Sequence, residues 1–196
     1  MPHAHIERKR DLILGHEHAM AQRLAAKVLD KPKPPMWMIF IPVFFVFFAQ
    51  KMGQYKKGLR NFVDNYQKPR RLALDTAMDL LATGAAFDPQ APVPMLAGVP
   101  ESARPLFLQW LEIMVEHYRL LLAAQGDSHT ILVRGAYRTK ADYLLFLNCL
   151  HRAENAFNLA LLPGMQGDVQ DLRAVIDRID TWGMELCRQD AGTIFP

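Results

Sequence analysis

Apolar residues recur at steps of three and four through most of the chain, with polar and charged residues between them. This period is typical of amphipathic helices, and no stretch shows the alternation of a strand bounded by turns. Proline and glycine mark the places where the periodic stretches stop. The pattern predicts an all-α fold, a helical bundle with helices over residues 5–29, 50–67, 72–83, 104–125, 128–137 and 140–162 and a last one after Asp168.

The helix predicted over residues 5–29 has an apolar face and charged faces. One side is apolar and carries Ile6, Ile13, Met20, Leu24 and Val28. The charged residues fall on the other faces in this assignment: Arg8, Lys9, Glu17 and Arg23. Later helices are preceded by side chains that can accept hydrogen bonds from the free N–H groups of a helix start, which predicts N-caps at Asp127 or Ser128, Thr139 and Asp168.

One segment departs from the amphipathic pattern. Residues 36–49 are all apolar and include five phenylalanines. A helix that is apolar on every side has no face to give to water, so it must lie in lipid, in a protein core or against another copy of itself. The uncharged run 34–50 would extend roughly 25 Å as a helix, against about 30 Å of hydrocarbon in a bilayer, which makes a full span marginal.

The segment is therefore predicted to be a short, proline-kinked, membrane-embedded helix over residues 36–50. Pro42 lies in its middle, where proline kinks a helix and where a re-entrant hairpin would turn. Aromatic residues flank the apolar centre, as they do at membrane interfaces. The residues predicted to enter the membrane are Trp37, Phe40, Pro42, Phe44, Phe45, Phe47 and Phe48.

Charge is divided along the chain. Residues 1–71 hold fourteen Lys or Arg against five Asp or Glu, whereas residues 72–196 hold nine against fifteen. The basic residues directly after the apolar segment predict contact with anionic lipid headgroups, at about 1 kcal/mol per charge, and a cytoplasmic C-terminal part. No nucleic-acid recognition motif accompanies them, so nucleic acid is not an expected partner. The predicted lipid contacts are Lys51, Lys56, Lys57 and Arg60.

These observations divide the chain into three predicted parts. Residues 1–35 form an amphipathic helix and a proline-rich linker, and residues 36–50 form the membrane-embedded helix. The cytoplasmic helical domain, 51–196, is subdivided into basic juxtamembrane helices, a proline-rich loop and an acidic helical bundle, over residues 51–84, 85–102 and 103–196.

Candidate chemistry is sparse. Metal-ligating residue types occur on two predicted helices, as Glu112, Glu116 and His117 and as His151, Glu154 and Asn155. Their order does not match the paired Glu-x-x-His pattern of a di-iron bundle, so neither a metal nor another cofactor is expected. The chain has no glycine-rich phosphate loop and no nucleophile elbow. Cys149 and Cys187 have no disulfide or metal spacing and are interpreted as small core residues.

The stretch from Lys33 to Phe48, followed by Tyr-Lys-Lys-Gly-Leu at 55–59, resembles the corresponding part of a family of uncharacterised bacterial membrane-associated proteins of this length. The resemblance implies that the apolar segment and the basic residues after it form one unit. It implies no activity and assigns no functional residue.

The predicted function is interaction or scaffolding at the inner face of a bacterial membrane, with the anionic bilayer and a protein or a second copy as partners, and a non-enzymatic role is favoured. A first alternative is a membrane-bound enzyme for a lipid-linked or anionic substrate, and a pocket gathering His151, Glu154, Arg134 and Arg138 would favour it. A second alternative is a soluble all-α oligomer that buries the phenylalanine-rich segment between subunits.

Overall fold

The computed structural model describes residues 2–31, 42–164 and 168–196. The predicted all-α class is confirmed, because every regular element in these ranges is helical. The α-helices are α1 (Pro2–Val28), α2 (Pro42–Thr83), α3 (Arg104–Ala123), α4 (His129–Tyr137), α5 (Lys140–Leu161) and α6 (Val169–Ile194). Short 3-10 helices are η2 (Pro94–Gly98), η3 (Glu101–Ala103) and η4 (Leu162–Gly164).

Three helices begin where local chemistry predicted. The Ser128 hydroxyl accepts a hydrogen bond from the Ile131 amide at the start of α4, and the Thr139 hydroxyl accepts one from the Asp142 amide at the start of α5. The Asp168 carboxylate does the same for the second and third residues of α6. These side chains satisfy N–H groups that the helix itself leaves free, so a few residues suffice to place each helix start.

α2 is longer than the sequence pattern predicts. The pattern predicts one helix ending near Gln67 and a second beginning after Pro69, but the structure has one helix of 42 residues with Pro69 inside it. An interior proline costs about 3 kcal/mol or more through its missing donor and its ring. The turns on both sides of Pro69 are buried in the bundle, and this tertiary packing outweighs the local cost at Gln67, Arg70, Ala73, Leu74 and Ala77.

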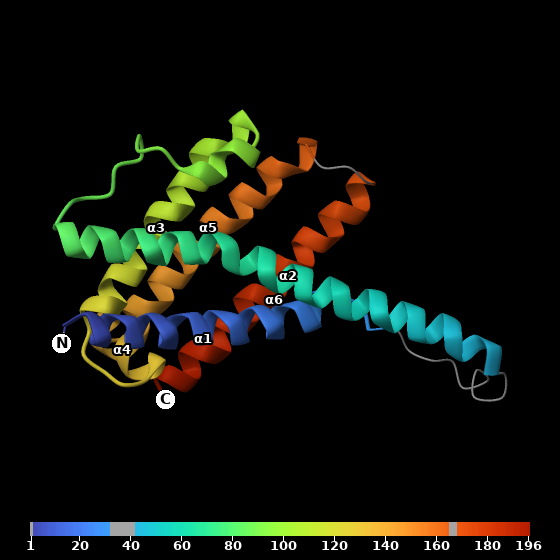
Figure 1. The fold of residues 1–196 in the computed structure, drawn as a ribbon, viewed down its shortest axis with the longest axis horizontal. Helices are drawn as coiled ribbons and strands as arrows, with labels where there is room; N and C mark the ends of the chain where they lie inside the picture. Colours follow the sequence, from blue (N-terminus) through green and yellow to red (C-terminus); the bar gives the residue numbers. More distant parts are fainter. Residues whose placement is uncertain (1, 32–41, 165–167) are drawn as a thin grey trace.

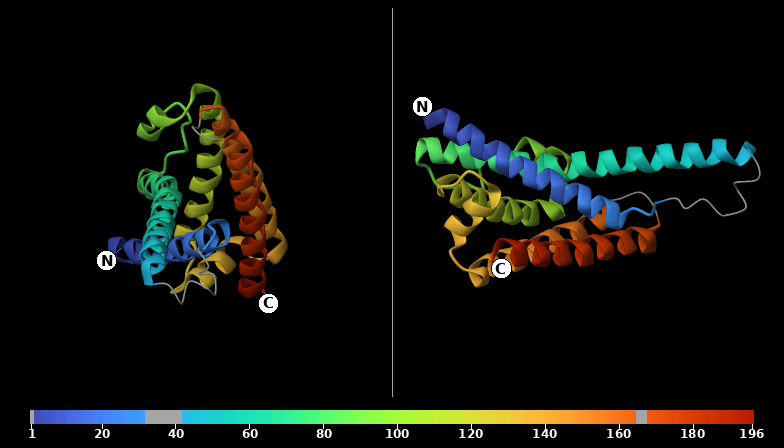
Figure 2. Two further views of the ribbon diagram at one scale, coloured as in Figure 1. Left: turned by 90° about the vertical axis from the view of Figure 1, so that its right-hand side faces the viewer. Right: turned by 90° about the horizontal axis from the view of Figure 1, so that it is seen from below.

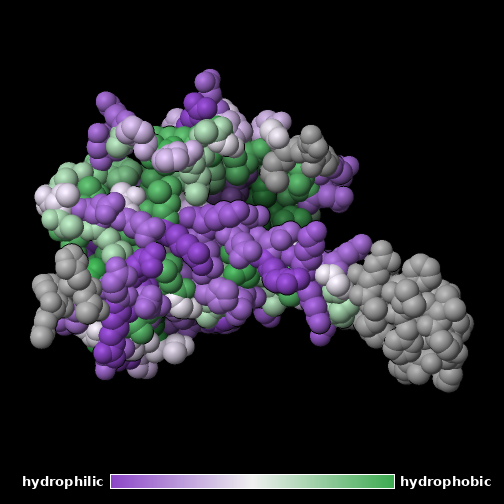
Figure 3. Space-filling view, in the orientation of Figure 1, coloured by the Kyte–Doolittle hydropathy of each residue, from purple (hydrophilic) through white to green (hydrophobic). Residues whose placement is uncertain are grey.

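The bundle is built around α3 (Figures 1 and 2). Its buried face meets the second half of α2 on one side and α5 on the other, and α6 packs against α5 and α1. The space-filling view shows hydrophilic residues along α2, with apolar residues beside them (Figure 3). The main core contains Leu74, Phe107, Leu111, Met114, Tyr118, Leu121, Leu122 and Leu132 among its most deeply buried side chains.

α1 is an integral part of this bundle, so the predicted separation of residues 1–35 from the helical domain does not describe its packing. It lies against α2 and α6 and also contacts α3 and α4. One of its charged residues is also buried: Lys9 is 4% exposed and its Nζ donates to the Leu122 carbonyl at 2.7 Å. The apolar side chains of α1 that are at most 3% exposed are Ile13, Ala21, Leu24, Ala25 and Val28.

The first part of α2 extends beyond the bundle. A Cβ at Gly58 would lie 3.7 Å from Cδ1 of Leu29, which directly follows α1. From there towards Pro42, α2 projects away from the other helices (Figure 1). We call residues 42–57 of α2 the arm; at about 1.5 Å per residue it is about 24 Å long.

Candidate functional site

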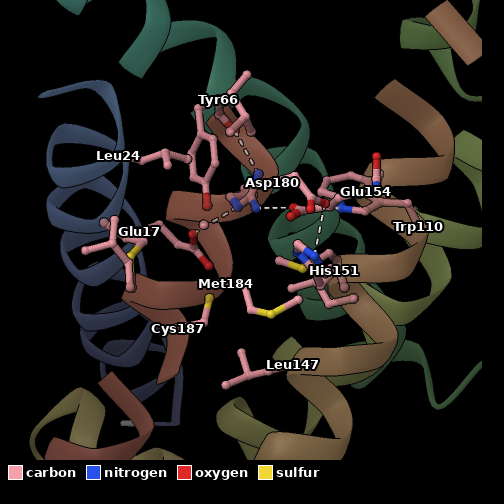
Figure 4. A pocket seen from close by; sticks show the side chains of 18 of the residues that line it. Glu17, Leu24, Tyr66, Trp110, Leu147, His151, Glu154, Asp180, Met184 and Cys187 are labelled. Atoms are coloured by element: carbon pink, nitrogen blue, oxygen red, sulfur yellow. Dashed lines mark hydrogen bonds and ion pairs between the residues drawn. The ribbon is translucent and has the colours of Figure 1, made fainter. Parts of the chain in front are cut away.

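A single guanidinium lies at the centre of the bundle's polar interior. Arg70 of α2 is 5% exposed. Its Nε lies 3.0 Å from Oε2 of Glu17 on α1, and its Nη2 donates to Oε1 of Glu154 on α5. Glu17 and Glu154 approach from opposite sides, as Figure 4 shows. The guanidinium carbon also lies 3.5 Å from the centroid of the Tyr66 ring, so the cation is stacked as well as paired.

Two side chains of α3 hold the carboxylates in place. The Tyr118 hydroxyl donates to Oε1 of Glu17 at 2.8 Å, and the Trp110 indole N–H donates to Oε1 of Glu154 at 3.2 Å. The network, which we define as Glu17, Tyr66, Arg70, Trp110, Tyr118 and Glu154, therefore joins α1, α2, α3 and α5.

The network keeps its central charge. Burial opposes the charged form of Arg70, but the Glu154 and Glu17 carboxylates favour it, and the pKa of Arg70 is raised above its ordinary value. Burial raises the pKa of Tyr66 and of Tyr118, so both phenols stay protonated. The centre is thus one cation between two carboxylates, with neutral hydroxyl and indole groups around it.

A cavity of about 460 Å³ lies beside the network. Its lining comes from α1, α2, α3, α4, α5 and α6 and is mainly apolar, with Leu24, Leu147 and Met184 among the walls (Figure 4). Cys187 also lines it, and burial raises the pKa of this thiol to about 12, which makes it a poor nucleophile at neutral pH.

Two imidazole–carboxylate pairs border the same cavity. Nε2 of His151 lies 3.0 Å from Oδ1 of Asp180, and Nε2 of His16 lies 3.4 Å from Oδ2 of Asp190. Both carboxylate oxygens are buried, and neither has a hydrogen bond of good geometry within the described chain. The cavity therefore carries carboxylates that are only partly satisfied.

A group of imidazoles lies at one end of the cavity. The His16 and His129 rings stack with centroids 3.6 Å apart. His117 stacks on Phe146 at 4.2 Å, and its Nδ1 lies 2.6 Å from the Tyr137 hydroxyl. Burial is the main cause that lowers the pKa of His117 to about 3 and that of His129 to about 2, so both rings are neutral at neutral pH.

The predicted membrane and lipid-contact residues that the structure describes lie on α2, in the arm or, for Arg60, three residues after it. Trp37 and Phe40 lie outside the described residues. Pro42 is the first residue of α2 rather than an interior kink. Lys56, Lys57 and Arg60 are exposed. The predicted residues that follow Pro42 on α2 are Phe44, Phe45, Phe47, Phe48, Lys51, Lys56, Lys57 and Arg60.

No helix in the described ranges combines enough length with enough apolar character to cross a bilayer, so the predicted transmembrane helix has no support in them. The same ranges contain no group of three His, Cys, Asp or Glu side chains placed to hold a metal ion.

The four residues of the enzyme alternative are not brought together. His151 and Glu154 line the cavity, but the Arg134 Nε donates to the carbonyl of Ile194, the last residue of α6. Arg138 caps the end of α4 in a left-handed conformation, with φ 59°. The interpretation of Cys149 as a core residue is wrong, because its side chain is exposed.

Arg70 and Glu17 are the site residues that the pattern missed. Glu17 lies four residues after Ile13 and three before Met20, which places it on the apolar side of α1. Arg70 lies four residues after Tyr66 and four before the buried Leu74. A charge of each sign on an apolar helix face is the signal that could have predicted a buried pair.

Comparisons of the chain with protein-family models, with curated proteins and with solved structures find no match. The resemblance to a bacterial membrane-associated family therefore stays a prediction, and a functional proposal rests on the residues and geometry described above.

Proposed function

We propose that the protein attaches to the inner face of a bacterial membrane through the arm of α2 and presents its helical bundle there for interaction or scaffolding. The observation that carries the proposal is the course of α2, which leaves the bundle and ends in the most apolar stretch of the described chain (Figure 1).

The order of residues along the arm supports a shallow insertion. Residues 42–49 are uncharged and contain four phenylalanines. Burying a phenylalanine contributes about 1.5–3 kcal/mol, so a few of them suffice for attachment. The insertion need not cross the bilayer, because eight helical residues extend only about 12 Å.

The exposed cations follow at a suitable distance. Lys56, Lys57 and Arg60 come seven to eleven residues after Ala49. This places them about 10–17 Å along the helix from the apolar end, within reach of the headgroups and of a surface potential that decays over about 8–10 Å. Their positive charge also favours the cytoplasmic side of the membrane.

Vesicle flotation tests the proposal. The full-length protein should float with vesicles that contain anionic phosphatidylglycerol and less well with purely zwitterionic ones. Replacing Phe44 and Phe48 together with Asp should abolish flotation on both, because two carboxylates would enter the hydrocarbon. Failure of the unaltered protein to float with either vesicle would overturn the proposal.

The basic residues are tested separately. Changing Lys56, Lys57 and Arg60 together to Gln should weaken binding to anionic vesicles by about 3 kcal/mol, roughly a hundredfold, at low salt. The matched control changes three exposed bundle arginines to Gln: Arg8, Arg152 and Arg173. Equal loss in the control would show that net charge, not the arm, attracts the protein. Sedimentation of the Phe variant without vesicles checks the oligomer alternative, which requires that variant to dissociate.

A further inference from the structure

The cavity beside Arg70 is a partly open space between the helices of the bundle. Its volume of about 460 Å³ is within the size range of small-molecule binding sites. The network joins four of the six helices that line it: α1, α2, α3 and α5. These hydrogen bonds and ion pairs hold the lining helices in position without a ligand, as expected of a preformed binding site.

The charges that face the cavity have an acidic excess. Four carboxylates line it, those of Glu17, Glu154, Asp180 and Asp190, together with two arginines, Arg70 and the exposed Arg188. Arg70 is already engaged by Glu17 and Glu154. An anionic ligand would have to lie against these carboxylates or take Arg70 from them, and either change leaves a buried carboxylate unpaired.

Two of these carboxylates still have room for a donor. Oε1 of Glu154 accepts from both Arg70 and Trp110, whereas Oε2 has no hydrogen-bond partner within the described chain. Oδ1 of Asp180 meets His151 at 3.0 Å without hydrogen-bond geometry. Each side chain is 30% exposed, and Figure 4 shows both beside His151 at the cavity's polar end.

We propose that this cavity binds a primary organic amine, with its ammonium group between Glu154 and Asp180 and its apolar body against Leu24, Leu147 and Met184. An ammonium supplies three donors and a positive charge that offsets the acidic excess of the lining. The apolar lining takes a hydrocarbon body of about ten heavy atoms, which is within the size range of small-molecule sites. The inference goes beyond membrane attachment and does not depend on the arm.

Three probes of similar shape test the charge preference: 3-phenylpropylamine, 3-phenylpropanol and 3-phenylpropanoate. Titration calorimetry on the full-length protein should show one amine bound per chain, at least about tenfold tighter than the alcohol or the carboxylate. Equal or tighter binding of the carboxylate would overturn the proposal. So would equal binding of all three probes, which indicates an unselective void, or no binding of the amine.

Variants locate the site. Asp180→Asn should weaken amine binding by about tenfold and leave alcohol binding nearly unchanged. Asp177→Asn is the matched control, because Asp177 is an exposed residue on α6 outside the cavity lining. Leu147→Trp should fill the cavity and abolish binding of every probe. An equal effect of Asp177→Asn and Asp180→Asn, or unchanged amine binding in Leu147→Trp, contradicts the assignment.

Membrane attachment through the arm and amine binding in the cavity can be tested independently. The Phe44→Asp, Phe48→Asp protein should lose flotation and keep amine binding, since both residues lie in the arm. Loss of amine binding in this arm variant would contradict a site inside the bundle.

Discussion

The two halves of α2 carry similar numbers of cations, and the second half encloses one of them, Arg70, in the bundle. The first half has four Lys or Arg up to Arg60, and the second half has three from Lys68 to Arg71. Lys56, Lys57 and Arg60 are exposed, whereas Arg70 is 5% exposed and held between two carboxylates. One continuous helix thus serves as a core element at one end and as a projecting arm at the other.

Whether a cation on α2 is buried or exposed therefore depends on the helices packed around it and not on its residue type. Arg70 is covered because α1, α3 and α5 meet α2 there. Lys56, Lys57 and Arg60 are exposed, so these cations keep their hydration. Substitutions in the bundle half of α2 should therefore change the stability of the fold. Substitutions in the arm should change only the proposed membrane attachment.

The largest expected effect comes from removing α1. A chain that begins at Lys51 lacks Glu17 and the buried residues Ile13, Leu24 and Val28. These three alone contribute about 5–9 kcal/mol, comparable with the whole stability of a domain. We expect this chain to lose cooperative thermal unfolding and near-ultraviolet circular dichroism. The control, Phe44 and Phe48 changed to Ser in the full chain, should keep its midpoint within about 2 °C. A sharp transition of the shortened chain near the full-length midpoint would refute the integral role of α1.

The second prediction concerns Arg70 itself. Arg70→Met should lower the free energy of unfolding by about 3–5 kcal/mol, because Glu17 and Glu154 then lose their shared cation. Arg60→Met, an exposed change on the same helix, should stay within about 0.5 kcal/mol. Urea unfolding followed by circular dichroism measures both. Adding Glu154→Gln to Arg70→Met should recover part of the loss; equal effects at Arg60 and Arg70 would contradict the buried network.

The third prediction is a loss of stability in acid. The pKa of His117 is lowered from 6.5 to about 3, so between these pH values the unfolded chain holds a proton that the folded chain excludes. Stability therefore rises with pH across this window, and His117 alone costs about 2.3 kcal/mol on going from pH 6.5 to about pH 4.5. Urea unfolding across this range should show a shallower pH dependence in His117→Phe, by up to one proton. His5→Asn, at an exposed site, should leave the dependence unchanged; an unchanged slope in His117→Phe would show that this ring titrates normally.

The smallest effect compares two glycines of α2. Gly58→Ala should raise the free energy of unfolding by about 0.5–1 kcal/mol, because a Cβ there makes an ordinary 3.7 Å contact with Leu29 and alanine favours the helix. Gly53→Ala makes the same change in the arm, where no atom lies within 4 Å of the added Cβ. It should leave the global unfolding free energy unchanged, because the arm frays independently of the bundle. Equal stabilisation at both positions would mean that the arm folds together with the core.

Local signals predicted the helix starts, and long-range contacts produced the errors. Thr139 and Asp168 could be recognised as caps because each acts on amides two or three residues away. The expected stop near Pro69 failed because helices distant in sequence cover that turn. Of the site, the pattern identified His151 and Glu154 as candidate polar residues on one helix, but the partner Arg70 lies 84 residues from Glu154, beyond any local pattern.

The sequence by itself determined the helical class, the caps and an apolar, basic-flanked segment, because helix period and capping depend on residues within a few positions of one another. Only the tertiary structure decided that α1 belongs to the core, that α2 continues through Pro69, and that Arg70 is enclosed rather than exposed. These outcomes depend on which helix faces meet. That choice is made by the packing of the whole chain, where the gain from burial exceeds the preferences of single residues.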